Sequence, residues 1–152
     1  MSIALTERGN MTLNLIKSVH DYPDKGGIPY YLHPIRVAGY LPDWAKNDED
    51  IFLAALLHDV VEDTSLSLDD LRVMGYSPKT QVIVLWVTKS ESYEFYDEWI
   101  DEIIRGGNKE AMLVKWADLQ DNMDPTRPHK ISDSQKTKYE KAFNKLTLAL
   151  GM

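Results

Sequence analysis

The stretch that decides the fold is Leu53-Ala54-Ala55-Leu56-Leu57-His58-Asp59-Val60-Val61-Glu62-Asp63-Thr64. The uniformly apolar run from Ile51 to Leu57 leaves no polar face, which predicts a helix buried in the protein core. Four ionisable side chains follow within six residues, and burying them is unfavourable unless a partner compensates their charge. Neutral imidazole and carboxylate are good ligands for divalent metal ions. The stretch therefore indicates a core helix that delivers an acid and imidazole cluster, with a bound cation as one candidate partner.

Amphipathic segments separated by single Pro and Gly residues surround this helix, so the sequence predicts an all-α fold. The run Val82 to Val87 has strand propensity, but its place after the start signal Ser77-Pro78 favours a helix. With 152 residues and 43% hydrophobic content, we expect a single domain over residues 1–152. Further helices are expected over about residues 2–19, over 93–105, from Asn108 to about Asn122, and over the last segment. Three others are expected to begin at Pro34, at an N-cap on Asn47 or Asp48, and at a capping box formed by Ser67 and Asp70.

Composition excludes several classes of function. The net charge of −7 argues against general binding of nucleic acid, which needs basic patches. The sequence has no cysteine, which excludes disulfides, thiolate metal sites and cysteine nucleophiles. No apolar run has the length of a membrane span, and no signal peptide is visible. We therefore expect a soluble cytoplasmic protein without a membrane partner, in which any metal ligands are His, Asp or Glu.

The acidic cluster has a helical spacing. If the helix continues through Asp63, His58 lies one turn from Glu62, and Asp59 lies one turn from Asp63. His58 and Asp59 can both reach one ion, but two protein ligands do not complete a metal site. The sequence must supply further ligands from elsewhere.

Two other segments offer such ligands. His33 stands directly before Pro34 at an expected helix start, and Asp118 ends an apolar stretch of a later helix. Purely structural explanations are also open. His58 would then be a hydrogen-bonded core histidine, and Glu62 and Asp63 would form a solvated last turn of the helix. Acidic side chains at a helix C-terminus oppose the helix dipole, which a purely structural role would not favour. Lys115, beside the apolar face, is expected to extend its ammonium group to water.

These motifs together resemble a known family. The segments Tyr30–Ala38, Leu53–Thr64, Val87–Lys89 and Val114–Asp118, with Asn122 after them, are similar in order and spacing to those of HD-domain metal-dependent phosphohydrolases. The similarity is to the hydrolase domain of RelA/SpoT-type alarmone enzymes and to their stand-alone, Mesh1-like small relatives. It extends over roughly residues 20–127 and implies a single-domain HD-type helical bundle.

The resemblance also implies a reaction and a set of roles. The family hydrolyses the 3′-diphosphate of the guanosine alarmones ppGpp and pppGpp and releases pyrophosphate, so the partner would be a small nucleotide. The implied cofactor is Mn²⁺ or another divalent transition metal. The implied roles are metal ligation by His33, His58, Asp59 and Asp118, water activation or positioning by Glu62 and Asp63, and nucleotide contacts from Lys25 and Asn122.

One position departs from the family. The loop 20–27 has Asp24 where the family usually has an arginine, while Lys25 is retained. Loss of a planar cation that can stack on a base or bind a phosphate is not conservative. Alternatives therefore stay open: an HD hydrolase for another nucleotide, such as an adenine alarmone, NADPH or a deoxynucleotide, or a nucleotide-binding module without turnover. The sequence does not predict the oligomeric state.

Overall fold

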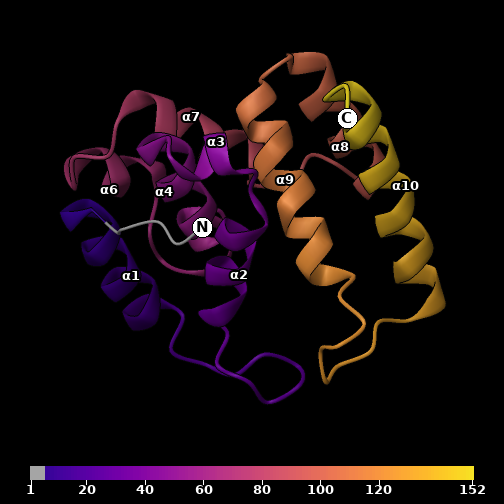
Figure 1. Ribbon diagram of the computed structural model, residues 1–152, viewed down its shortest axis with the longest axis horizontal. Helices are drawn as coiled ribbons and strands as arrows, with labels where there is room; N and C mark the ends of the chain where they lie inside the picture. The colour runs from indigo at the N-terminus through magenta and orange to yellow at the C-terminus, as the bar shows by residue number, and fades with distance from the viewer. Residues whose placement is uncertain (1–5) are drawn as a thin grey trace.

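The computed structural model describes residues 6–152 and is helical, as predicted (Figure 1). Within this range no strand forms, and only an isolated bridge joins Pro23 and Pro29. No helix of the described part is both long and apolar enough to cross a membrane. The helices are α1 (Glu7–Val19), α2 (Leu32–Tyr40), α3 (Asp43–Lys46), α4 (Glu49–Leu57), α5 (Val60–Asp63), α6 (Leu68–Val73), α7 (Pro78–Val87), α8 (Tyr96–Gly106), α9 (Lys109–Asn122) and α10 (Asp133–Ala149).

Most helix starts follow the predicted capping signals. The Asp48 side chain accepts the backbone N–H of Ile51 at the start of α4, and the Asn108 side chain accepts that of Ala111 at the start of α9. Ser67 and Asp70 form the predicted capping box of α6. Residues 82–87 are helical, as part of α7. Local capping therefore accounts for the positions of most helices.

Two predicted starts differ from the structure, and a third falls on residues that the structure does not describe. The predicted start of the first helix at Ser2 lies outside the described residues, and Thr6 caps α1 directly before Glu7. Pro34 is the third residue of α2, not the first, which the helix tolerates because N–H groups of the first turn have no helical acceptor. Helix α8 begins at Tyr96 instead of Tyr93.

The core helix ends earlier than predicted. Helix α4 stops at Leu57, and α5 begins at Val60, so the cluster does not lie on one continuous helix. The His58 Nδ1–H donates to the carbonyl of Ala55 at 2.7 Å. This carbonyl would accept the N–H of Asp59 in a continuous α-helix, so the imidazole competes with the helix for it. The prediction that His58 and Glu62 lie one turn apart on a single helix was therefore wrong.

Helix α9 lies between two hydrophobic clusters. One cluster, formed largely by α1, α2, α4 and α7, includes Val114 and Ala117 of α9. The other, formed with α8 and α10, includes Met112 and Leu119. In Figure 1, α9 runs between α2 and α10 and contacts both. The charged residues near its C-terminal end are thus held at the centre of the protein.

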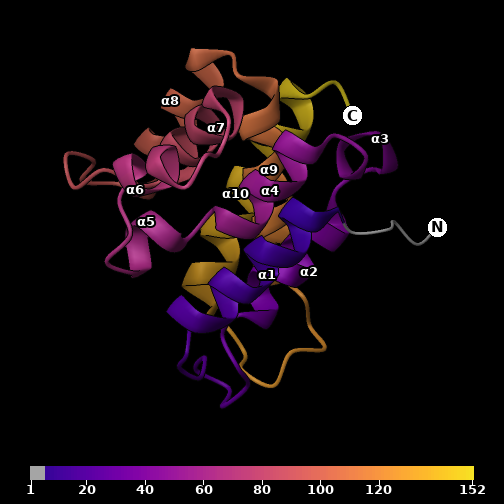
Figure 2. The same cartoon turned by 90° about the vertical axis from the view of Figure 1, so that its left-hand side faces the viewer.

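Two loops lie together at one end of the helices. The loop between α1 and α2 and the loop between α9 and α10 are at the same end in both views (Figures 1 and 2). A Cβ atom added at Gly26 in the first loop would lie 3.2 Å from the backbone nitrogen of His129 in the second. The two loops are therefore in contact.

Candidate functional site

Four side-chain atoms of the four predicted ligands converge in the protein interior. His33 Nε2 lies 2.8 Å from Asp118 Oδ1 and 3.5 Å from Asp59 Oδ2. His58 Nε2 lies 3.2 Å and 3.1 Å from the same two oxygen atoms. His33, His58 and Asp118 are buried and form a group able to hold a metal ion. Helices α2 and α9 and the turn after α4 bring these side chains together.

Both histidines are oriented by hydrogen bonds on their other ring nitrogen. The Ala55 carbonyl can only accept, so His58 Nδ1 carries the proton. His33 Nδ1 lies 2.6 Å from a carboxylate oxygen of Asp121, which likewise requires a donor. Both Nε2 atoms therefore point to the centre as acceptors when the imidazoles are neutral, the form that binds metals.

The electrostatics of the cluster favour a positive charge at its centre. Burial alone lowers the pKa of His58, but Asp59 and Asp118 outweigh it and raise this pKa well above its usual value. Burial alone raises the pKa of Asp118, but Lys115 and the two histidines hold it well below its usual range. The carboxylates of Asp59 and Asp118 are thus ionised and direct negative charge to the centre. The donor set of imidazole nitrogens and carboxylate oxygens fits a divalent transition metal.

Lys115 is part of this centre, contrary to the expectation that its ammonium group reaches water. Its side chain is buried and its Nζ donates to Asp118 Oδ2 at 2.7 Å. The ammonium also lies 4.6 Å from the Trp99 ring centroid. Lys115 fixes one carboxylate oxygen of Asp118 while the other faces the histidines. The spacing of Lys115 and Asp118, one helical turn apart, was the sequence signal for this pair.

Asp121 is a second residue that the sequence analysis missed. Its carboxylate is fully buried and accepts from His33 Nδ1 and from Arg36 Nε at 2.7 Å. Carboxylates that orient a metal-binding imidazole in this way strongly affect metal affinity. The only available signal was an aspartate one turn after Asp118 on the same helix.

Asp63 and Glu62 lie beside the four-atom centre in different environments. Tyr30 Oη is 2.6 Å from Asp59 Oδ2 and 3.2 Å from Asp63 Oδ2. Burial, Asp59 and Glu62 raise the pKa of Asp63 to about 6. Glu62 instead accepts the backbone N–H of Lys89 at 2.7 Å. A pKa of about 6 suits the Asp63 carboxylate to accept a proton near neutral pH.

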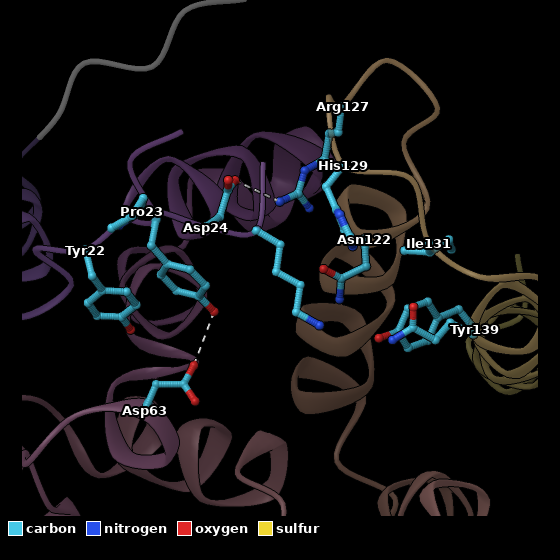
Figure 3. Close-up of a pocket in the computed structure, with 12 residues that line it drawn as sticks. Tyr22, Pro23, Asp24, Asp63, Asn122, Arg127, His129, Ile131 and Tyr139 are labelled. Carbon is cyan, nitrogen blue, oxygen red and sulfur yellow. Dashed lines mark hydrogen bonds and ion pairs between the residues drawn. The ribbon is translucent and has the colours of Figure 1, made fainter. Parts of the chain in front are cut away.

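Two pockets meet at this site. We call them the His–Asp pocket, of about 220 Å³, which holds the four-atom centre, and the loop pocket, of about 500 Å³, which lies between the two loops. The loop pocket has the size of a small-molecule site. Figure 3 shows Asp63 on one side of the loop pocket and Asn122 and Tyr139 on the other. The residues that line both pockets are Tyr30, Asp63, Asn122 and Tyr139.

The predicted nucleotide contacts line the loop pocket. Lys25 is one of its exposed residues, and Asn122 sits where the pockets meet, with Nδ2 at 3.3 Å from Asp118 Oδ1. Asp24 Oδ1 accepts the backbone N–H groups of Gly26 and Ile28, so this carboxylate shapes its own loop. Tyr139 of α10 also faces both pockets.

The architecture is the helical HD hydrolase fold with a buried His–Asp centre. No family model matches the sequence. A solved structure described as a metazoan ortholog of SpoT that hydrolyzes ppGpp has a TM-score of 0.78 and 27% identity, covering 98% of this chain and 88% of that one.

Curated relatives point the same way. The chain is 36% identical over 98 residues to the guanosine-3′,5′-bis(diphosphate) 3′-pyrophosphohydrolase MESH1 of Drosophila melanogaster, which is 62% of this chain and 54% of the relative. It is 41% identical over 71 residues to a probable enzyme of the same name from Synechocystis, which is 47% of this chain and 9% of the relative. The chain thus matches about half or less of each. By sequence and fold it is a relative of the Mesh1-like HD hydrolases.

Proposed function

We propose that this chain is a metal-dependent 3′-pyrophosphohydrolase of the guanosine alarmones ppGpp and pppGpp. The observation that carries the proposal is the junction of the two pockets at Tyr30, Asp63, Asn122 and Tyr139. A nucleotide in the loop pocket can extend a phosphorylated arm through this junction to the His–Asp pocket. The names of the relatives, among them the Drosophila 3′-pyrophosphohydrolase, support a guanosine alarmone as the substrate.

The proposed cofactor is Mn²⁺ or another divalent transition metal. His33 Nε2, His58 Nε2, Asp59 Oδ2 and Asp118 Oδ1 would hold it, since these atoms already converge. When bound, such a cation neutralises phosphate oxygens and lowers the pKa of water. The same ligands suit Fe²⁺, Co²⁺ and Ni²⁺, so the choice of metal rests on the family resemblance.

The proposed reaction uses Asp63 as the proton acceptor. Water attacks the phosphorus atom that is joined to the ribose 3′-oxygen, and the bond between this phosphorus and the 3′-oxygen breaks. Asp63 takes one proton of the water and then gives it to the departing ribose 3′-oxygen, so the products are pyrophosphate and GDP or GTP, and Asp63 is ionised again. No covalent intermediate with the protein forms. Glu62, through the Lys89 backbone, holds the loop after α7 at the pocket wall.

Substrate contacts are proposed for two residues. Lys25 supplies a cation in the loop pocket, and Asn122 contacts the nucleotide at the junction. The substrate is a small molecule in the cytoplasm, without a nucleic acid or membrane partner, which is consistent with the net charge of −7. The oligomeric state is left open.

A second candidate is hydrolysis of another nucleotide, such as an adenine alarmone, NADPH or a deoxynucleotide. The observation that favours it is Asp24, which replaces the usual arginine and whose oxygens bind Gly26, Ile28 and Arg127. A non-catalytic nucleotide-binding module is less well supported, because both candidate catalytic carboxylates are present beside the four-atom centre.

The test is pyrophosphate release from ppGpp by the purified chain with Mn²⁺, with EDTA as the control. Metal-dependent release supports an alarmone hydrolase. If a chain with stoichiometric Mn²⁺ leaves ppGpp intact but hydrolyses another nucleotide of a panel, the second candidate replaces the first. If it binds nucleotides and hydrolyses none of them, the binding module is correct.

A further inference from the structure

The Arg127 guanidinium lies between carboxylates from two different elements. Its Nη2 is 3.3 Å from Asp24 Oδ2 in the loop between α1 and α2. Its Nη1 is 3.3 Å from Asp121 Oδ2 and 3.2 Å from the Asp121 carbonyl oxygen, at the end of α9. The Arg127 side chain is 20% exposed, so these pairs are partly shielded from water. Figure 3 shows Asp24 and Arg127 joined at the rim of the loop pocket.

The backbones of the two loops meet at the same place. A Cβ atom at Gly26 would lie 3.3 Å from Pro128 Cβ and 3.2 Å from the His129 nitrogen. Both loops also line the loop pocket, with Tyr22 and Lys25 on one side and His129 on the other. The Asp24–Arg127 pair therefore fixes the separation of two walls of this pocket.

The same contacts continue to the four-atom centre. Asp121 Oδ2, which accepts from Arg127, is 2.6 Å from His33 Nδ1. His33 Nε2 faces Asp118 Oδ1 at 2.8 Å. A continuous line of charged contacts thus runs from Asp24 through Arg127 and Asp121 to His33. Because the guanidinium contacts two carboxylates, its charge is already balanced and it is poorly placed to bind a phosphate group.

We propose that Arg127 is a positioning residue that ties the loop 21–29 to His33 through Asp121. In this role it sets the shape of the loop pocket and the orientation of one metal-binding imidazole together. A lysine at this position keeps the charge but lacks the planar fork that reaches two carboxylates at once. The effect on nucleotide affinity rests on the proposed function, whereas the effect on metal affinity does not.

The test compares Arg127→Gln, Arg127→Lys and Asp24→Asn with a matched control in the full chain. Lys79→Gln is the control, because it removes an ion pair between α7 and the α4 cap, Lys79 Nζ to Asp48 Oδ2 at 2.7 Å, and neither residue lines a described pocket. The measurements are the Mn²⁺ dissociation constant, by titration with the metal alone, and KM and kcat for ppGpp.

We expect Arg127→Gln to weaken Mn²⁺ binding about tenfold, the lower end for groups that orient metal ligands, and to raise KM. Arg127→Lys should give smaller changes in both. Asp24→Asn should raise KM and leave the Mn²⁺ dissociation constant unchanged, since the Arg127–Asp121 contact remains. Lys79→Gln should change neither quantity.

Separate outcomes would overturn each part. If Arg127→Gln and Arg127→Lys lower the melting temperature but leave the Mn²⁺ dissociation constant unchanged, the tie to His33 is wrong. An unchanged KM in Asp24→Asn removes the role in the loop pocket. If the unmodified chain does not hydrolyse ppGpp while Arg127→Gln still weakens Mn²⁺ binding, the proposed function fails and the tie to His33 stands. If Arg127→Gln does not fold, the lysine variant and Asp24→Asn decide both parts.

Discussion

Tyr30 and Asp59 are joined by a 2.6 Å hydrogen bond in which the phenol donates to Oδ2, the carboxylate oxygen that faces both histidines. Burial and the charge of Asp59 raise the pKa of Tyr30, so the phenol keeps its proton. The same hydroxyl lies 3.2 Å from Asp63 Oδ2. One side chain therefore links a candidate metal ligand to the candidate base.

Replacing Tyr30 with phenylalanine tests this link. We expect Tyr30→Phe to keep metal and lose about tenfold in kcat, because a hydrogen bond to a charged group contributes about 1.5 kcal/mol. Steady-state kinetics and metal content measure the two effects. Tyr76→Phe is the control, since its hydroxyl bonds to Thr12 away from the site. Equal kcat in Tyr30→Phe and the unmodified chain would contradict the link.

The proposed ligand set predicts loss of metal from two variants. His58→Ala and Asp118→Ala each remove a donor that faces the centre. We expect both proteins to retain less than about a tenth of the metal of the unmodified chain, by analogy with losses of 10–100-fold for more remote groups. Elemental analysis after gel filtration measures this. His129→Ala, on the exposed loop, is the control, and a stoichiometric ion in Asp118→Ala would disprove the set.

The two acidic neighbours should behave differently. Asp63→Asn removes the proposed proton acceptor, so we expect a loss of about 10²–10⁴-fold in kcat with metal retained. Glu62→Gln keeps an oxygen that can accept the Lys89 N–H, so its loss should be smaller. Single-turnover rates at saturating Mn²⁺ compare the variants. A larger loss in Glu62→Gln than in Asp63→Asn would reverse the two assignments.

The raised pKa of Asp63 predicts a dependence of activity on pH. Its carboxyl has a pKa of about 6 in the folded chain without metal, and a bound cation lowers that value. The ionised form accepts the proton, so kcat/KM should rise with pH through an inflection at or below about pH 6 and then level off. A pH profile measures the inflection, and the residual activity of Asp63→Asn should lack it. An inflection that persists in this variant belongs to another group.

Metal binding should also stabilise the fold. The convergent carboxylates and imidazoles form this arrangement only in the folded chain, so Mn²⁺ favours folding by about 2.7 kcal/mol at a concentration of 100 times Kd. We expect the melting temperature to rise with Mn²⁺ and to fall again with EDTA. Asp118→Ala serves as the control without a site. If Mn²⁺ does not change the melting temperature of the unmodified chain, the proposal that the folded chain has a metal site is contradicted.

The helices could be predicted because their signals are local. Asp48, Ser67 and Asn108 each cap a helix within their own first turn, and these contacts depend only on neighbouring residues. The break after Leu57 could not be predicted in this way. At the break, the imidazole of His58 donates to the Ala55 carbonyl, which a continuous helix would use for the Asp59 N–H, and no local capping residue signals this contact.

The candidate site likewise has a part that could be predicted from the sequence and a part that could not. The ligand types were visible as His58-Asp59 and as His33 before Pro34, and the resemblance to a family grouped them with Asp118. The residues that orient them were not visible, because Asp121 meets His33 across 88 positions of the sequence. Such contacts depend on how α2 packs on α9, and a single sequence does not give this packing.

The separation of loops from core also bears on how such a protein can evolve. Neither hydrophobic cluster includes a residue of the loops 21–31 or 124–131, whereas the His–Asp centre is anchored on packed helices. Loop mutations that spare the Asp24–Arg127 pair therefore leave both hydrophobic clusters untouched, so folding stability constrains them little. A lineage built on this frame can exchange one nucleotide for another by loop substitutions, provided that the Arg127–Asp121 contact to the hydrolytic centre is kept.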